Sequence, residues 1–268
     1  MEKIITFRSV LIALSLCAPP GPLQAAADFR TPEYYASTGL DYLRAAEAYE
    51  RGYTGKDVIV GVLDIGFATG GEFAGKYPYG IKGSQEMLHF HGITVTGVIS
   101  ALKNDIGMHG IAFDSQLMPY NGAQPYGILK TDIERAWRMF ASCPDITIIN
   151  NSWTSLYHLD DEPEPDDPDY PDYWNLVYDA NKVEIDAASL LAARDKLVVM
   201  AAGNNGHLSP AVTGGMPALI DRVGARNDIS LNWLNVSAFD PAYPSSHPAF
   251  IPVFTNLGQY ASEYTLLA

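Results

Sequence analysis

The sequence predicts an α/β fold: a parallel β-sheet covered by helices on both faces, in three layers. Two observations indicate this. Short apolar runs alternate along the chain with segments of helical periodicity. The runs also lack the apolar–polar alternation of half-exposed strands, so they fit strands buried on both faces. Alternating strands and helices require parallel pairing with right-handed crossovers, which places helices on both sides of the sheet.

The first 27 residues have the pattern of a secretory signal peptide. Lys3 and Arg8 precede an apolar run over residues 9–18, and small residues at 25–27 offer a cleavage site before Asp28. That run is shorter than the roughly 18 apolar residues of a membrane span, and no other stretch reaches that length. We therefore expect an exported protein, in the periplasm, at the cell surface or secreted, with residues 28–268 forming a single partial domain.

Charge and cysteine content limit the partners and the redox chemistry. The formal net charge is −14 at pH 7. Such acidity argues against nucleic acid or an anionic membrane as a partner. Only Cys143 follows the expected cleavage site, so no intrachain disulfide is expected.

The first elements after the signal peptide are a helix, a strand, a helix and a strand. After an irregular beginning, residues 41–51 carry apolar side chains near helical spacing, with Gly52 as a stop. Residues 58–64 read as a central buried strand. A glycine-rich loop leads to a buried helix from about His91 to Leu102, and residues 115–120 form a short strand.

The second half continues the alternation. Thr131 and Glu134 have the spacing of a capping box, followed by an apolar helix face that contains Trp137 and Phe140. Strands are then expected at 146–150, 197–200 and 233–238, a helix at 183–194, and a long glycine- and proline-bearing loop before the last strand.

An acidic insertion separates two of these elements. Residues 159–173 alternate Asp and Glu with Pro, and such a run cannot bury itself. We expect a solvated surface insertion. Calcium binding is an alternative that the dense prolines disfavour. We assign no cofactor and no metal ligands.

Three polar residues stand where chemistry is expected in a parallel sheet, at or near the carboxyl ends of strands. Asp64 ends the first strand in VLDIGF. His91 precedes Gly92 at the start of an apolar helix. Asn204 follows the strand KLVVM in MAAGNNG. Each signal alone is weak, and the order of the three carries the information.

Together these motifs resemble the subtilisin-like (S8) serine proteases. The family's signatures are an Asp-Ser/Thr-Gly strand end, a His-Gly-Thr-His-Val-Ala-Gly helix and an Ala-Ala-Gly-Asn strand end. INNSW at 149–153 and NDIGMHGIA at 104–112 match further, and the segment 31–64 looks closest to the exported autotransporter branch. The resemblance runs from about Thr31 to the last residue.

The resemblance implies a role for each residue. His91 would be the general base, Asp64 would orient it, and the Asn204 amide would stabilise the oxyanion. Polypeptides would be the substrates. The residues implied to bind them are Ser152, Trp153, Thr154, Ala201, Ala202 and Gly203.

The sequence departs from the family pattern in two ways. Ile65, Ile93, Thr94 and Thr154 replace usual motif residues, which affects the shape of the cleft more than the Asp–His pair. More important, the family's Gly-Thr-Ser-x-Ala motif is absent, and Ser84, Ser152 and Ser209 lack its context. We expect a missing C-terminal part with the serine helix, an apolar groove on one sheet face, and a chain inactive by itself.

Two other functions compete with a peptidase. A nucleotide-binding domain is disfavoured because Gly66, Gly70 and Gly71 do not have phosphate-loop spacing. A non-catalytic pseudoprotease that binds peptides by strand addition at residues 149–154 is the closer rival. The sequence thus predicts an N-terminal part of an exported subtilisin-like endopeptidase.

Overall fold

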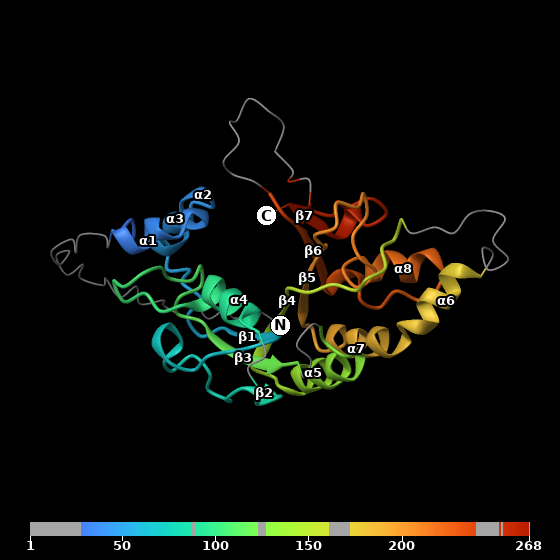
Figure 1. Cartoon of the computed structure of the whole chain (residues 1–268), viewed down its shortest axis with the longest axis horizontal. Coiled ribbons are helices and arrows are strands. Elements are labelled where there is room, and N and C mark those ends of the chain that lie inside the picture. Colours follow the sequence, from blue (N-terminus) through green and yellow to red (C-terminus); the bar gives the residue numbers. More distant parts are fainter. Residues whose placement is uncertain are drawn as a thin grey trace, which may run out of the picture.

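The computed structural model describes residues 28–86, 89–122, 127–160, 172–239, 252 and 254–267 (Figure 1). Its seven strands form one sheet in the order β2-β3-β1-β4-β5-β6-β7, and every strand pair is parallel. The strands are β1 (Ile59–Asp64), β2 (Lys82–Gly83), β3 (Gln116–Asn121), β4 (Ile146–Asn151), β5 (Leu197–Ala201), β6 (Trp233–Ser237) and β7 (Thr265–Leu267).

Helices connect most of these strands, and the predicted α/β fold is confirmed. They are α1 (Pro32–Ala36), α2 (Thr38–Tyr42), α3 (Ala45–Glu50), α4 (His91–Ser100), α5 (Lys130–Ser142), α6 (Tyr173–Ala180), α7 (Lys182–Ala192) and α8 (Met216–Arg222), with 3-10 turns η1 (Gly71–Phe73), η2 (Ser230–Asn232) and η3 (Ser262–Tyr264). No helix of the described residues is long and apolar enough to cross a lipid bilayer.

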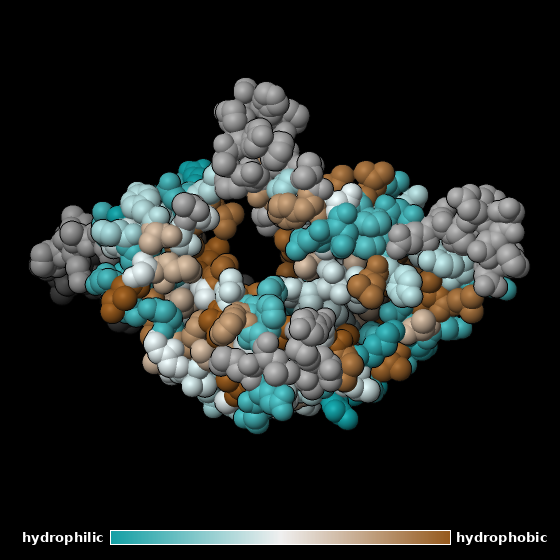
Figure 2. All heavy atoms as spheres, in the orientation of Figure 1, coloured by the Kyte–Doolittle hydropathy of each residue, from teal (hydrophilic) through white to brown (hydrophobic). Residues whose placement is uncertain are grey.

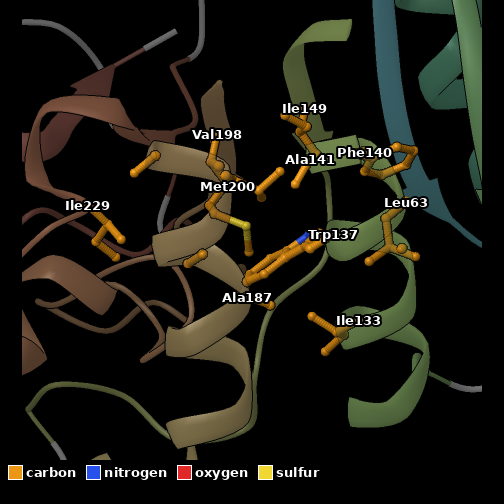
Figure 3. Close-up of a cluster of buried hydrophobic side chains, with 14 of the residues drawn as sticks. Leu63, Ile133, Trp137, Phe140, Ala141, Ile149, Ala187, Val198, Met200 and Ile229 are labelled. Atoms are coloured by element: carbon orange, nitrogen blue, oxygen red, sulfur yellow. The ribbon is translucent and has the colours of Figure 1, made fainter. Parts of the chain in front are cut away.

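One face of the sheet packs against α5, α7 and α8 to form the main core. Trp137 on α5 is fully buried at its centre, close to Met200 of β5 and Ala187 of α7 (Figure 3). Its indole Nε1 donates a hydrogen bond to Asn151 Oδ1 at 3.0 Å. Because a buried indole N–H needs an acceptor, this bond fixes the ring against the end of β4.

The opposite face is covered unevenly. Helix α4 packs Val95 and Ile99 onto Val60, Val62 and Leu117 of β1 and β3. Along β5 and β6, by contrast, residues on the core face are buried while their neighbours on the opposite face are only half-buried.

Apolar side chains are therefore accessible on this second face. Leu266 of β7, in register with the half-buried Val236 of β6, is 50% exposed on this face, and Val98 is 58% exposed on α4, the helix that packs there. Figure 2 shows apolar side chains around the opening in the middle of the molecule. An apolar groove on one sheet face was predicted from the sequence; the missing serine-bearing helix stays a prediction.

The N-terminal region differs from the prediction. The expected helix over 41–51 is divided into α2 and α3, because Arg44 adopts a left-handed backbone conformation with φ 57°. The segment expected to be irregular contains α1. There, Thr31 Oγ1 accepts the Tyr34 N–H at 3.3 Å and Pro32 occupies the first turn, both of which favour a helix start.

The predicted capping box is wrong. Helix α5 begins at Lys130, so Thr131 lies inside its first turn, and no side chain caps it. The backbone carbonyl of Leu129 instead accepts the N–H groups of Asp132 and Ile133. The apolar face that includes Ile133 and Trp137 is buried as predicted.

Other boundaries show what the periodicity missed. Helices α6 and α8 were not predicted, and α8 starts with Pro217 in its first turn within the segment expected to be a loop. The signal peptide at 1–27 and most of the acidic insertion, 161–171, lie outside the described residues.

The core predicts the effect of removing Trp137. We expect Trp137→Ala to lower the free energy of unfolding by about 3–5 kcal/mol, because a large buried ring and a buried hydrogen bond are lost. Urea unfolding followed by far-ultraviolet circular dichroism measures this. The control Leu231→Ala, at a side chain 95% exposed, should change stability by about 0.5 kcal/mol or less. Equal losses in the two variants would contradict the packing described.

The uncovered sheet face predicts self-association. We expect the chain to form oligomers through this face, because large contiguous apolar patches favour association. The variant Leu266→Lys should shift it toward monomer in size-exclusion chromatography with light scattering. Leu231→Lys, at an isolated exposed leucine, is the matched control. A monomeric wild-type chain would contradict the prediction that this patch is an association surface.

Candidate active site

The site begins at the carboxyl end of the central strand. Asp64 is the last residue of β1, which pairs with β3 on one side and β4 on the other. The residue is 1% exposed, and its Oδ1 accepts the backbone N–H of Ile65 at 2.7 Å. A carboxylate buried this deeply requires compensating partners.

His91 supplies the second partner. It is the first residue of α4, and its Nδ1 lies 2.7 Å from Asp64 Oδ1. The imidazole is 44% exposed whereas the carboxylate is 2% exposed. The pair therefore presents a ring that solvent can reach, held from behind by a buried carboxylate.

Two glycines allow this contact. The Gly92 N–H donates to Ile65 O at 2.9 Å, and a Cβ on Gly92 would lie 2.5 Å from Gly66 O. Gly66 has φ +78°, and a Cβ there would lie 1.6 Å from His89 O. Any side chain at either position would push the start of α4 away from β1.

The contact also sets the protonation of the ring. The hydrogen bond to Asp64 raises the pKa of His91 above its usual value, while burial acts in the opposite direction. A hydrogen bond from Nδ1–H to the carboxylate leaves Nε2 as the acceptor in the neutral ring. This arrangement can act as a general base toward a hydroxyl group.

Asn121 belongs to the site and was missed by the sequence analysis. It ends β3 in register with Asp64 and is 4% exposed. Its Oδ1 accepts the Gly66 N–H at 2.8 Å, and its Nδ2 donates to the carbonyls of Ser84 and Glu86. The signal was a polar residue ending an apolar strand next to the Asp64 strand.

A cavity of about 1000 Å³ adjoins the Asp–His pair. Asp64, Ile65 and His91 lie among its lining residues, and the segment Ser152–Tyr157 contributes a wall. The structure thus brings Ser152, Trp153 and Thr154, predicted to bind substrate, to the same cavity as His91. Side chains from α5, α6 and α7 line another part of it.

The second predicted group lies elsewhere. Asn204 is exposed in the loop after β5, and neither it nor the segment Ala201–Gly203 lines this cavity. Ala202 and Gly203 are buried against Asn256, whose Nδ2 donates to Ala202 O at 3.1 Å. The Asn256 Oδ1 accepts the N–H of Asn205, which fixes the loop. The oxyanion role of Asn204 stays a prediction.

No serine hydroxyl of the described residues hydrogen-bonds to His91. Ser152 Oγ accepts from Asn150 Nδ2 at 3.0 Å, and Ser209 Oγ donates to Asp160 Oδ1 at 2.6 Å. These serines have other partners, which agrees with leaving them unassigned as nucleophiles.

No group of three or more His, Cys, Asp and Glu residues in the described ranges could hold a metal ion. The loop at Asn104 and Asp105 is held by a protein carboxylate. Glu33, 4% exposed, accepts both of their backbone N–H groups, at 2.9 and 3.0 Å.

An imidazole polarised by a buried carboxylate, at the carboxyl edge of a parallel sheet, defines a general-base site of the kind found in hydrolases with a hydroxyl nucleophile. Residues 55–263 match the Peptidase S8 family, described as the subtilase family. The chain belongs to this family of serine peptidases.

Known relatives agree with this assignment. Two extracellular serine proteases of Serratia marcescens are 33% and 32% identical over 154 and 150 residues. The aligned segments cover 54% and 53% of this chain but only 14% of each relative.

Solved structures share the fold. The prenylagaramide maturation protease PagA superposes with a TM-score of 0.59 at 18% identity, covering 84% of this chain and 66% of PagA. The nisin leader peptidase NisP from Lactococcus lactis gives 0.61 at 17% identity, covering 88% and 68%.

The Asp–His contact predicts a pH dependence. The folded-state pKa of His91 lies above its unfolded value of about 6.5, so the pair stabilises the protein fully below that pH. The contribution is lost as pH rises through the folded-state pKa. Asp64→Asn should lower the His91 pKa, measured by NMR titration of the imidazole protons. An unchanged His91 pKa in this variant would show that Asp64 does not hold the ring.

Proposed function

We propose that this chain is the N-terminal part of an exported serine endopeptidase that uses an Asp-His-Ser triad, with Asp64 and His91 as two of its members. The 2.7 Å contact between His91 Nδ1 and Asp64 Oδ1 carries the proposal. It leaves the accessible ring able to take a proton from a serine hydroxyl and return it to the leaving amine.

The remaining steps follow the chemistry of acyl transfer. The serine oxygen would attack the scissile carbonyl, and the Asn204 amide would donate a hydrogen bond to the resulting oxyanion. Breaking the C–N bond would release the amine, which takes the proton from His91. Water would then hydrolyse the acyl-enzyme by the same base.

The serine would come from a segment that follows Ala268 in a longer native product. No Gly-Thr-Ser occurs in the 268 residues. The matched segment makes up a small share of the Serratia relatives, so a longer product fits this proposal. The half-buried face of β5 and β6 would be covered by the serine-bearing segment.

Export is part of the proposal. Residues 1–27 have a signal-peptide pattern, and the two relatives are named extracellular proteases. Residues 28–268 would form the partial peptidase domain, with the acidic segment about 159–173 inserted in it. The resemblance of residues 31–64 to the autotransporter branch makes a cell-surface or secreted product the specific expectation.

A peptide-binding pseudoprotease is the second candidate. It is favoured by the absence of a serine partner for His91 in the described ranges and by the cavity beside residues 152–157. The predicted strand addition over 149–154 is wrong for residues 149–151, because this part of β4 already pairs with β1 and β5, and only residues 152–154 could add a peptide. This function needs no proton transfer, so peptide binding would survive His91→Ala. Cleavage by an assembled enzyme would not.

The chain alone should not hydrolyse casein. Loss of the serine from a subtilisin lowers turnover by about a millionfold, the value the well-studied subtilisin triad gives. We therefore expect the purified chain and its His91→Ala variant to show equal background hydrolysis. Proteolysis by the wild-type chain that His91→Ala abolishes would contradict this and reveal a nucleophile within the sequence.

The protein isolated from its source tests whether a longer product carries the reactive serine. Fluorophosphonate labelling combined with intact mass should give a labelled species clearly heavier than 29.2 kDa. An unlabelled product no heavier than this chain would instead support the pseudoprotease.

A further inference from the structure

The cavity beside His91 contains a charged pair that the proposed triad does not use. Lys130 opens α5 and Glu184 lies in the first turn of α7, and both residues line the cavity. The Lys130 Nζ lies 3.2 Å from Glu184 Oε1. Glu184 is 1% exposed, whereas the lysine side chain is 56% exposed.

The hydrogen-bonding capacity of the lysine is fully used. An ammonium group has three N–H donors. Lys130 Nζ has three acceptors within reach: Glu184 Oε1 at 3.2 Å, Ala180 O at 2.5 Å and Asn181 Oδ1 at 3.4 Å. It has no donor left for an anionic ligand.

Glu184, by contrast, has an unused hydrogen-bond acceptor. Its Oε2 is buried and has no hydrogen-bond partner among the described residues. A buried carboxylate oxygen without a donor is costly, and a donor supplied by a ligand would remove that cost. The open capacity of this pair is therefore for a group that donates hydrogen bonds.

The surroundings select the kind of donor. Apolar side chains on two helices line the same cavity, Ile133 on α5 and Leu176 and Val177 on α6, together with Trp153 after β4. A cavity lined by apolar side chains and by a buried carboxylate suits a long aliphatic stem with a cationic end, since lysine and arginine side chains bury their methylene groups in this way.

We propose that Glu184 is a specificity-determining residue: it receives the lysine or arginine side chain of a peptide bound in the cavity beside His91. This rests on the proposed peptidase function, because it requires a polypeptide in the cleft. The 1% exposed carboxylate, its unpaired oxygen and the apolar lining carry the assignment.

Binding measurements test this without a nucleophile. Each set of fluorescein-labelled peptides carries Lys, Arg, Gln or norleucine at one position and is otherwise identical. Successive sets move that position along the peptide. Fluorescence anisotropy with the full chain should show Lys or Arg peptides bound about tenfold or more tightly than the norleucine peptide at one position, since hydrogen bonds to a charged group are strong. The Gln peptide should fall between them.

Variants separate this role from a structural one. Glu184→Gln should bring the Lys-to-norleucine ratio close to one, while Lys130→Met, which removes the competing cation, should keep or raise it. Glu263→Gln removes an equal charge from an exposed position on η3 and should leave the ratio unchanged. A merely structural ion pair would lower the melting temperature in both Glu184→Gln and Lys130→Met without moving the ratio.

The two proposals fail differently. Peptides bound with equal affinity at every substituted position would overturn the role of Glu184 and leave the peptidase assignment standing, as would a preference that survives Glu184→Gln. Absence of binding by all peptides would likewise overturn the role of Glu184, while the peptidase assignment is tested separately by fluorophosphonate labelling of the native protein.

Discussion

The close approach of α4 to the loop after β1 is the constraint on which the site depends. A backbone hydrogen bond from Gly92 to Ile65 O and the absence of side chains at Gly66 and Gly92 bring the helix start against the strand end. Only at that separation can His91 reach Asp64. Asn121 holds the Gly66 turn from the neighbouring strand, so the geometry is set by β1, β3 and α4 together.

The two faces of the sheet are unequal, and the inequality bears on function. One face packs α5, α7 and α8 around Trp137 into a complete core. On the other, α4 covers β1 and β3, while apolar residues of β5, β6 and β7 are half-buried or exposed. The Asp–His pair lies beside the covered part. The pair is therefore formed within the described residues, in a sequence that contains no Gly-Thr-Ser motif.

The two charged pairs that line the cavity differ in the chemistry they allow. Its lining includes two deeply buried carboxylates, Asp64 and Glu184, and each keeps one oxygen without a donor among the described residues. Their partners differ. Asp64 holds a half-exposed imidazole that can exchange a proton, whereas Glu184 holds an ammonium whose donors are all occupied. The first pair is thus suited to proton transfer, and the second, set among apolar side chains, is suited to an external donor.

The fold could be predicted from the apolar runs of the sequence, and the Asp–His pair from the resemblance of its motifs to the subtilisin-like family. Uninterrupted apolar runs specify buried parallel strands, and residues such as Asp64 at strand ends must meet at one edge of the sheet. Local patterns gave wrong helix boundaries at two places. Arg44 divides a periodic helix, and α5 starts one residue before the apparent cap. Only the tertiary structure decided that Asn121 supports the site, that Asn204 lies outside the described cavity, and that Lys130 meets Glu184. Those relations join segments tens of residues apart, and side-chain contacts between distant segments depend on packing that no local period encodes.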